Sequence, residues 1–454
     1  MLKFFNTLSK KIEDFVPINQ SHIKIYVCGP TVYDKIHIGN ARPLVVFDTL
    51  VRLLKYKYPK VTYVRNITDV DDKINERLLT EKITLKDLTD KTIIDFQKDC
   101  ASLNNLPPDY EPRATEHISE MINMIENLIL NKFAYLSQGH VLFNIKKFSE
   151  YGSLSNRTLE EMISGSRVEV ADYKVNPGDF VLWKPSDENI PGWESPWGRG
   201  RPGWHIECSA MSKKYLGVQF DIHGGGADLI FPHHENEIAQ SRCANNSDSL
   251  ANYWMHNGYV NIDNVKMSKS LKNFVSISDL LDRFKGEAIR YFLLQSHYRA
   301  PLNFSNNSLL EANTSLSSLY RSIRDLTVNG DPDKEILTNL EDDVNTPKVF
   351  SRLHYLSEQA NKGSVEAAQL LKNSSPILGL LENTSDNWFK TNLLNEDDTS
   401  INKLTKKQIL DLIEKRANAK TKKYFELADK IRKSLDDQGI VLEDNADGTD
   451  WRYK

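Results

Sequence analysis

The sequence feature that most constrains the fold is a strand, a glycine-containing loop, a helix and a second strand within residues 23–66. Residues 23–27 are a short run rich in Ile, Val and Tyr, which predicts a buried strand. The apolar pattern after His37 has helical spacing, and Pro43 lies near its start, where a helix tolerates proline. Residues 61–66 predict the second strand. Such a unit is typical of a doubly wound α/β sheet, whose ligands bind at the carboxyl ends of the strands.

Length and composition indicate a soluble protein of several domains. The chain has 454 residues, of which 40% are hydrophobic and 26% charged, as in ordinary globular proteins. The sequence shows no apolar run long enough for a membrane helix, and its first residues lack a signal-peptide core. Only four cysteines are present, which argues against a disulfide framework and predicts a cytoplasmic location.

Charge is distributed unevenly along the chain. The net charge of −4 does not indicate a polyanionic partner for the protein as a whole. Residues 403–433, however, contain 11 Lys or Arg against four Asp or Glu. A helical segment of this composition can follow a phosphate backbone, and the alternative is a helix with a solvated charged face.

The pattern changes between about Thr80 and Trp193, where helical segments precede short strand-like pieces. Residues 116–135 are the clearest helical segment, and we interpret the whole region as an insertion that interrupts the sheet. Residues 278–382 are mostly helical, with periodic apolar positions that predict a helix bundle. The polar, acidic stretch 392–403 is typical of a linker and precedes a small basic terminal unit.

One downstream stretch gathers side chains that bind metals. It contains Cys208, a glycine triplet, His233 and Glu237. The last two are four residues apart, so on a helix they share one face, whereas His234 and Glu235 would point away from it. A thiol, an imidazole and a carboxylate are three of the donor types that hold zinc.

A fourth donor is available at the carboxyl end of the first strand. Cys28 directly follows that strand and Thr68 follows the second, so both are placed to face a site at the edge of the sheet. Zinc normally takes four ligands. The alternative is that Cys28 and Cys208 are small buried hydrophobes and that His233 is a hydrogen-bonded core residue. These spacings match no closed zinc-finger pattern.

Two short motifs indicate chemistry on phosphates. The sequence HIGN (His37–Asn40) lies where a glycine permits close backbone approach and a helix N-terminus favours an anion. The sequence KMSKS (Lys266–Ser270) brings two ammonium groups and two hydroxyls into one loop, which suits a phosphate chain that gains charge in a transition state. Taken singly, the first motif is typical of a helix cap and the second of a solvent-exposed loop. Their order around one α/β unit strengthens the functional interpretation of both motifs.

These motifs resemble the HIGH and KMSKS signatures of class I aminoacyl-tRNA synthetases. More narrowly, the chain resembles the cysteinyl-tRNA synthetase family over essentially its whole length. The fourth position of the first motif is Asn40 instead of His; Asn can still donate a hydrogen bond, but its role there stays open. The matching stretches read YVCGPTVYDKIHIGN, NITDVDDKI, RPGWHIECSAM, FDIHGGGADLIFPHHENEIAQ, YWMHNGYV, KMSKSLKNF and the terminal GIVLED.

The resemblance implies an α/β fold with a Rossmann-like catalytic domain, an inserted connective domain, an α-helical bundle and a small C-terminal anticodon-binding unit. We therefore expect the following division of the chain: catalytic domain, first half, 1–115; connective insertion, 116–200; catalytic domain, second half, 201–262; KMSKS loop and stem-contact region, 263–300; helical bundle, 301–395; anticodon-binding domain, 396–454.

The resemblance also implies a reaction in which cysteine and ATP, with Mg²⁺, give cysteinyl-adenylate and pyrophosphate before the cysteinyl group passes to tRNA(Cys). The residues it assigns to catalysis and ATP are His37, Asn40, Lys266 and Lys269, with Gly39 and Asp228 contacting ATP. The zinc ligands carry over as Cys28, Cys208, His233 and Glu237. The residues that line the cysteine pocket carry over as Thr68, Trp204, His205 and His223, for which simple packing is the alternative.

Zinc would supply selectivity. A pocket that measures shape alone separates near-isosteres such as cysteine and serine by about two orders of magnitude. Zinc favours a thiolate over a neutral hydroxyl, so binding of the substrate thiolate would reject serine without an editing site. In the C-terminal unit, Trp451 and Arg452 are candidates to stack on or contact unpaired bases, with a packed Trp as the alternative. The family also implies a monomer.

Three rival functions stay open at this point. One is an enzyme that activates cysteine with the same core but joins it to a small amine; residues 400–454 argue against it. The second is a non-catalytic tRNA-binding relative, against which the lysines and the four metal donors argue. The third is a hydrolytic zinc enzyme, in which four protein ligands would leave less room for an activated water.

Overall fold

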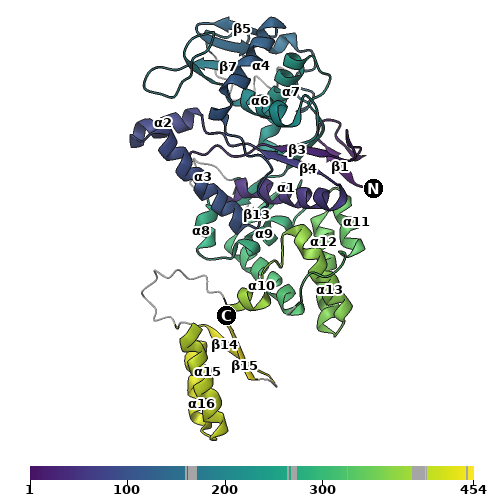
Figure 1. Ribbon diagram of the computed structural model, residues 1–454, viewed down its shortest axis with the longest axis vertical. Coiled ribbons are helices and arrows are strands. Elements are labelled where there is room, and N and C mark those ends of the chain that lie inside the picture. Colours follow the sequence, from purple (N-terminus) through teal and green to yellow (C-terminus); the bar gives the residue numbers. More distant parts are fainter. Residues whose placement is uncertain are drawn as a thin grey trace.

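The protein is built around a four-stranded parallel sheet with the strand order β10-β9-β3-β4 (Figure 1). The computed structural model describes all residues except 159–160, 162–170, 263–264, 267–273, 325, 391–403, 405, 446–447 and 454. The sheet strands are β3 (Ile23–Val27), β4 (Val61–Arg65), β9 (Phe220–Gly226) and β10 (Ala251–Asn257). The strands predicted at residues 23–27 and 61–66 are thus confirmed, and so is the α/β fold with a parallel sheet.

Helix α1 (Ile38–Lys57) connects β3 to β4 and packs on one face of the sheet. The alternation of side chains along β3 sends Ile25 and Val27 into a core shared with α1, whereas Tyr26 and Cys28 belong to the core on the opposite face. Gly224 lies where a Cβ would be 2.4 Å from the ring of Phe47, so the glycine permits close contact between α1 and β9.

The second face of the sheet carries helices α6 (Trp204–Leu216) and α7 (Glu235–Asn245). These helices pack on α4 (Ile118–Leu130) and on each other, which joins the sheet to the insertion drawn at the top of Figure 1. The helix expected over residues 116–135 ends at Leu130, because Asn131 and Lys132 turn the chain into a strand. The insertion contains an antiparallel sheet of order β5-β6-β7-β8, with β5 (Ala134–Ser137), β6 (His140–Phe143), β7 (Phe180–Pro185) and β8 (Gly200–Pro202).

The remaining elements before the bundle lie outside the central sheet. A hairpin at the N-terminus and two helices precede the insertion: β1 (Lys3–Asn6), β2 (Lys11–Asp14), α2 (Asp72–Glu81) and α3 (Leu85–Ser102). After β10 the chain forms a small sheet of order β12-β11-β13, from β11 (Val260–Ile262), β12 (Val265–Lys266) and β13 (Leu302–Phe304). Strand β13 lies inside the region predicted to be mostly helical; three residues give too short a pattern to reveal a strand.

The predicted helix bundle is confirmed and shares one continuous core with α1. It follows α8 (Ile277–Leu281) and α9 (Gly286–Leu294) and contains α10 (Asn306–Ser322), α11 (Lys334–Glu341), α12 (Thr346–Asn361), α13 (Val365–Ser374) and α14 (Ser385–Lys390). No helix among the residues that the structure describes is both long and apolar enough to cross a membrane.

The C-terminal unit lies at the far end of the molecule from the insertion (Figure 1). Helices α15 (Lys406–Thr421) and α16 (Phe425–Asp437) form a hairpin and pack on strands β14 (Ile440–Asn445) and β15 (Gly448–Tyr453), which pair antiparallel. The linker predicted at residues 392–403 lies outside the described residues.

Candidate active site and metal centre

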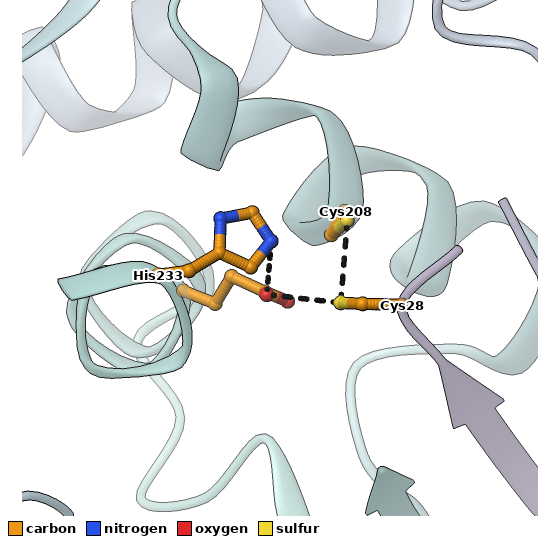
Figure 2. Close-up of side chains that lie close together, drawn as sticks. Cys28, Cys208 and His233 are labelled. Carbon is orange, nitrogen blue, oxygen red and sulfur yellow. Dashed lines mark hydrogen bonds and ion pairs between the residues drawn. The ribbon is translucent and has the colours of Figure 1, made fainter. Parts of the chain in front are cut away.

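Four donor side chains that are far apart in the sequence meet at the carboxyl ends of the central strands. They come from the residue after β3, from α6, from the turn before α7 and from α7 itself: Cys28, Cys208, His233 and Glu237. Their ligand atoms all lie within 4.8 Å of one another. Figure 2 shows Cys28, Cys208 and His233 converging from three separate segments. The proximity expected from the sequence is therefore confirmed.

The spacing of these atoms suits a small tetrahedral ion. The two Sγ atoms of Cys28 and Cys208 are 3.6 Å apart, and the Cys28 Sγ is 3.5 Å from Glu237 Oε1. His233 Nε2 lies 3.0 Å from the same oxygen. Zinc with bonds of about 2.0–2.3 Å in a tetrahedron separates its donors by roughly 3.3–3.8 Å. The four residues therefore fit zinc. The shortest of these donor–donor distances is the one between His233 and Glu237.

Burial makes the arrangement selective for a cation. Cys208 and His233 are each 1% exposed and Glu237 is fully buried. Burial would raise the pKa of Glu237, but His223 and His233 hold it well below its usual range. Burial would likewise lower the pKa of His233, and Glu237 instead raises it to about 10. The carboxylate thus brings a fixed negative charge into a low-dielectric site.

The two thiols differ in acidity. Burial raises the pKa of the Cys28 thiol well above its usual range, and the neighbouring Cys208 raises it further. Burial would also raise the pKa of Cys208, but hydrogen bonds from Cys28 and His233 lower it to about 6. Cys208 is therefore ready to act as a thiolate ligand at neutral pH, whereas Cys28 gives up its proton when a cation arrives.

His233 and Glu237 interact across one helical turn, as their spacing predicts. The expectation that His234 points away from them is wrong. Its ring is fully buried, with Nε2 at 3.9 Å from Glu237 Oε1. The backbone explains this, because residues 230–234 form a π-helical turn in which Phe231 is extended, so a regular helical projection fails there. Glu235 does point away and accepts hydrogen bonds from the backbone of the insertion.

The residues predicted to line the cysteine pocket surround the donor cluster. His205 Nδ1 lies 3.0 Å from His233 Nδ1, and the half-exposed Trp204 ring stacks on His233 with centroids 4.3 Å apart. His223 is fully buried, with Nε2 at 2.9 Å from Glu237 Oε2. It is thus in contact with a donor and has no exposed surface. Such outer hydrogen bonds orient metal ligands.

Thr68 lies on the same side, close to α6. Its Oγ1 donates to Glu207 Oε2 at 2.9 Å and accepts from Asn66 at 3.2 Å. Burial raises the pKa of Glu207 well above its usual range. Sequence reasoning missed Glu207, and its position beside Cys208 in the sequence RPGWHIECSAM is the signal that could have found it.

The HIGN motif forms the N-terminus of α1. His37 is the N-cap, and its Nδ1 accepts from the Asn40 N–H at 3.3 Å while the Asn40 side-chain oxygen accepts from the His37 N–H at 3.2 Å. This reciprocal capping box fixes both side chains and leaves the Asn40 amide group as a donor. Gly39 lies in the first turn of the helix, and Asp228 is exposed beyond the glycines at the end of β9.

The described residues that follow the KMSKS loop contact this motif. Lys266 is the last residue of β12, with its side chain outside the described part, and Lys269 lies outside the described residues altogether. On the far side of the loop, Ser276 forms a β-bridge with His37, whose ring contacts that of Phe274 at 4.9 Å. The buried Arg42 of α1 also donates to the Gly258 and Tyr259 carbonyls just before β11.

In the C-terminal unit, Trp451 is 4% exposed and belongs to the core of the unit. This burial agrees with packing, the alternative for this residue, and a contact of Trp451 with tRNA stays a prediction. Arg452 Nε is held at 2.9 Å by Glu443. Sequence reasoning missed Tyr424 and Phe425, each 62% exposed where α15 turns into α16. The three lysines that precede these two aromatics in the sequence KTKKYF could have revealed them.

Comparison with known proteins identifies aminoacyl-tRNA synthetases as relatives of this chain. Residues 14–314 match the family model described as tRNA synthetases class I (C) catalytic domain. A cysteine–tRNA ligase of Paramagnetospirillum magneticum is 50% identical, with 99% of both chains covered. A cysteine–tRNA ligase of Rhodospirillum rubrum is 49% identical over the same share of each. Methionyl-tRNA synthetase of Mycobacterium tuberculosis has the same fold, with a TM-score of 0.57 at 15% identity, covering 79% of this chain and 89% of that one.

Proposed function

The chain belongs to the cysteine–tRNA ligase family of class I aminoacyl-tRNA synthetases, and we propose that it activates cysteine as the adenylate, with release of pyrophosphate from ATP, and transfers it to tRNA(Cys) at a zinc-dependent site. The observation that carries the zinc-dependent part is the buried cluster of two thiols, one imidazole and one carboxylate. A buried charge is costly unless it is paired, and Glu237 is fully buried between His223 and His233.

Cys28, Cys208, His233 and Glu237 would hold the zinc ion. When bound, zinc supplies a borderline-soft Lewis acid that prefers the thiolate of cysteine to the neutral hydroxyl of serine. Trp204 and His205 would orient His233 through ring stacking and a hydrogen bond, and Thr68 donates to Glu207, the residue before Cys208. The four metal donors would then lie next to the strand ends, where the ligands of such sheets bind.

The ATP phosphates would lie at the N-terminus of α1. Its first turn presents backbone N–H groups, the His37 ring and the Asn40 amide to the same region, a local arrangement that favours an anion. Gly39 and Asp228 would contact the rest of ATP, which enters with Mg²⁺. Lys266 and Lys269 would stabilise the charge that develops on the leaving pyrophosphate.

The tRNA would contact the basic C-terminal unit. Exposed Tyr424 and Phe425, flanked by Lys422 and Lys423, offer rings and charge for unpaired bases. Arg452 is partly exposed in the same unit, while Trp451 supports the contact by holding the hairpin β14–β15 on the helices. The proposed enzyme acts as a cytoplasmic monomer on tRNA(Cys), cysteine and ATP.

The test is charging of total tRNA with labelled cysteine beside labelled serine, with and without a zinc chelator. Attachment of cysteine alone, abolished by chelation and restored by added zinc, is the expected result. Cysteine-dependent pyrophosphate exchange without charging of any tRNA would show that cysteine is joined to another acceptor, such as a small amine. Equal charging with and without the chelator would overturn the role of zinc.

A further inference from the structure

We propose that a second set of metal donors, Cys28, His223, His234 and Glu237, overlaps the first and holds the same divalent ion when Cys208 is withdrawn. This inference rests on the metal centre of the proposed function and concerns residues that the first set does not use. The four ligand atoms of this inner set also lie within 4.8 Å of one another, and all four side chains are buried.

The geometry of the inner set is centred on Glu237. His223 Nε2 lies 2.9 Å from Glu237 Oε2, and His234 Nε2 lies 3.9 Å from Glu237 Oε1. The rings of His223 and His234 have centroids 4.4 Å apart. Cys28 completes the set with its Sγ at 3.5 Å from the carboxylate. One carboxylate therefore has histidine nitrogens of both sets within reach.

An unpartnered nitrogen points independently to a ligand. His234 is fully buried, yet its Nε2 has no hydrogen-bond partner among the described residues. Its other nitrogen is held at 2.8 Å by His256, which in turn is 2.8 Å from Thr7. A buried polar atom without a partner costs about 1–3 kcal/mol. This atom faces Glu237, so an ion between them would satisfy it.

Space for the His234 ring is provided by a glycine. A Cβ at Gly225 would lie 2.9 Å from His234 Cε1 and 3.2 Å from its Nε2. Any larger residue at this position would displace the ring from the donor cluster. The structure thus keeps the unpartnered nitrogen in place by close packing on β9.

The two sets share Cys28 and Glu237 and exchange the other two donors. The outer set holds the ion with two thiolates, and the inner set holds it with one thiolate and two imidazoles. An ion can therefore lose Cys208 without losing four-coordination by protein. The shared pair should be indispensable for metal binding, whereas Cys208 should be replaceable.

The experiment uses Co²⁺ as the probe, titrated into the metal-free full chain and followed by the thiolate-to-cobalt absorption band and by cobalt content per chain. The variants are C208S, H234A and the double variant C208S/H234A. C208S should keep one cobalt with the band of a single thiolate. H234A should weaken cobalt binding by roughly tenfold to a hundredfold more in the C208S background than in the native chain.

The matched control is His22→Gln, which removes a histidine that bonds Thr62 and belongs to neither donor set, and it should leave both titrations unchanged. The proposal is overturned if C208S binds no cobalt, or if H234A has the same effect in both backgrounds. C208A repeats the cycle should C208S not fold. A native chain that binds no cobalt would overturn the proposed metal centre as well, so the two failures are distinguishable.

Discussion

The body, residues 1–390, and its junction with the C-terminal unit, residues 404–454, contain different kinds of charge contact. In the body, Arg290 of α9 is fully buried and pairs with Asp48 of α1, which is 1% exposed and also accepts from Arg52 at 2.8 Å. At the C-terminal unit, Arg324 pairs with Glu443 at 3.2 Å, and both side chains are nearly half exposed.

The body and the C-terminal unit also differ in the size of their hydrophobic cores. The body has two large cores on the two faces of the sheet, whereas the core of the C-terminal unit contains five buried residues among those that the structure describes. A cavity of about 210 Å³ lies where the unit meets the bundle, lined by Arg324, Ser385, Asp386, Phe389, Lys390, Glu443, Asp450, Trp451 and Arg452. Buried ion pairs fix the geometry of the body. The exposed ion pairs at the C-terminal unit change the free energy of unfolding only slightly.

The largest effect is expected within the donor cluster. Glu237→Gln removes the one charge that both histidines contact, so metal affinity should fall roughly a thousandfold, the equivalent of breaking a buried ion pair. Equilibrium dialysis against zinc measures this. Glu235→Gln is the matched control, because that buried carboxylate lies two residues away but faces the insertion. Equal losses in the two variants would mean that burial alone, and not the cluster, determines binding.

The second effect tests buried against exposed pairing directly. Asp48→Asn leaves the buried Arg290 without its counter-charge and should lower the free energy of unfolding by about 3–5 kcal/mol. Arg324→Ala, its counterpart at the C-terminal unit, should change it by less than about 1 kcal/mol. Urea denaturation of both variants measures the difference. Similar losses would remove the distinction between the two regions.

The donor cluster shows which parts of the structure could be predicted from the sequence. The strand ends that carry Cys28 and Thr68 and the helical spacing of His233 and Glu237 follow from local periodicity, and the structure confirms them. The burial of His234 beside Glu237 depends on an irregular turn that no helical projection contains. That this cluster binds zinc stays a prediction.

Side-chain exposure in the small unit was also beyond sequence reasoning. Trp451 and Phe425 are both aromatic residues in a basic region, yet one is buried and the other 62% exposed. The difference arises from the pairing of β14 with β15, which turns Trp451 toward Leu442 and the helix hairpin. The register of this hairpin, and hence the face on which Trp451 lies, is not fixed by the composition of the segment alone. The roles of both residues toward tRNA stay predictions.

The third effect separates the two regions by activity. Trp451→Ala should destabilise the C-terminal unit by about 3 kcal/mol, because the ring fills much of a five-residue core. Cysteine-dependent pyrophosphate exchange should stay unchanged while tRNA charging falls. Tyr424→Ala, at an exposed ring, should leave the stability within about 0.5 kcal/mol and lower charging alone. Loss of pyrophosphate exchange in Trp451→Ala would show that the regions are not independent.

The smallest effect concerns Lys285, where α9 meets the helix that leads to the C-terminal unit. Its ammonium donates to the Trp388 carbonyl and lies over the Trp388 ring, and burial lowers the pKa of Lys285 to about 8. Between pH 8 and the unfolded value of 10.5, the unfolded chain binds the proton more than the folded one does. Stability contributed by this group must therefore rise with pH across that window.

Lys285→Met removes this titration. The native chain should gain about 1 kcal/mol relative to the variant between pH 8 and pH 10.5, because the partly exposed ammonium keeps some of its hydration. Urea denaturation of both chains across this range gives the difference. Parallel curves would mean that Lys285 is as well solvated as the exposed ion pairs of the C-terminal unit. A difference in the free energy of unfolding that rises with pH would instead show that Lys285 belongs with the buried charges. The exposed charges would then begin beyond α9, at the junction where Lys390 lies 3.1 Å from Asp450.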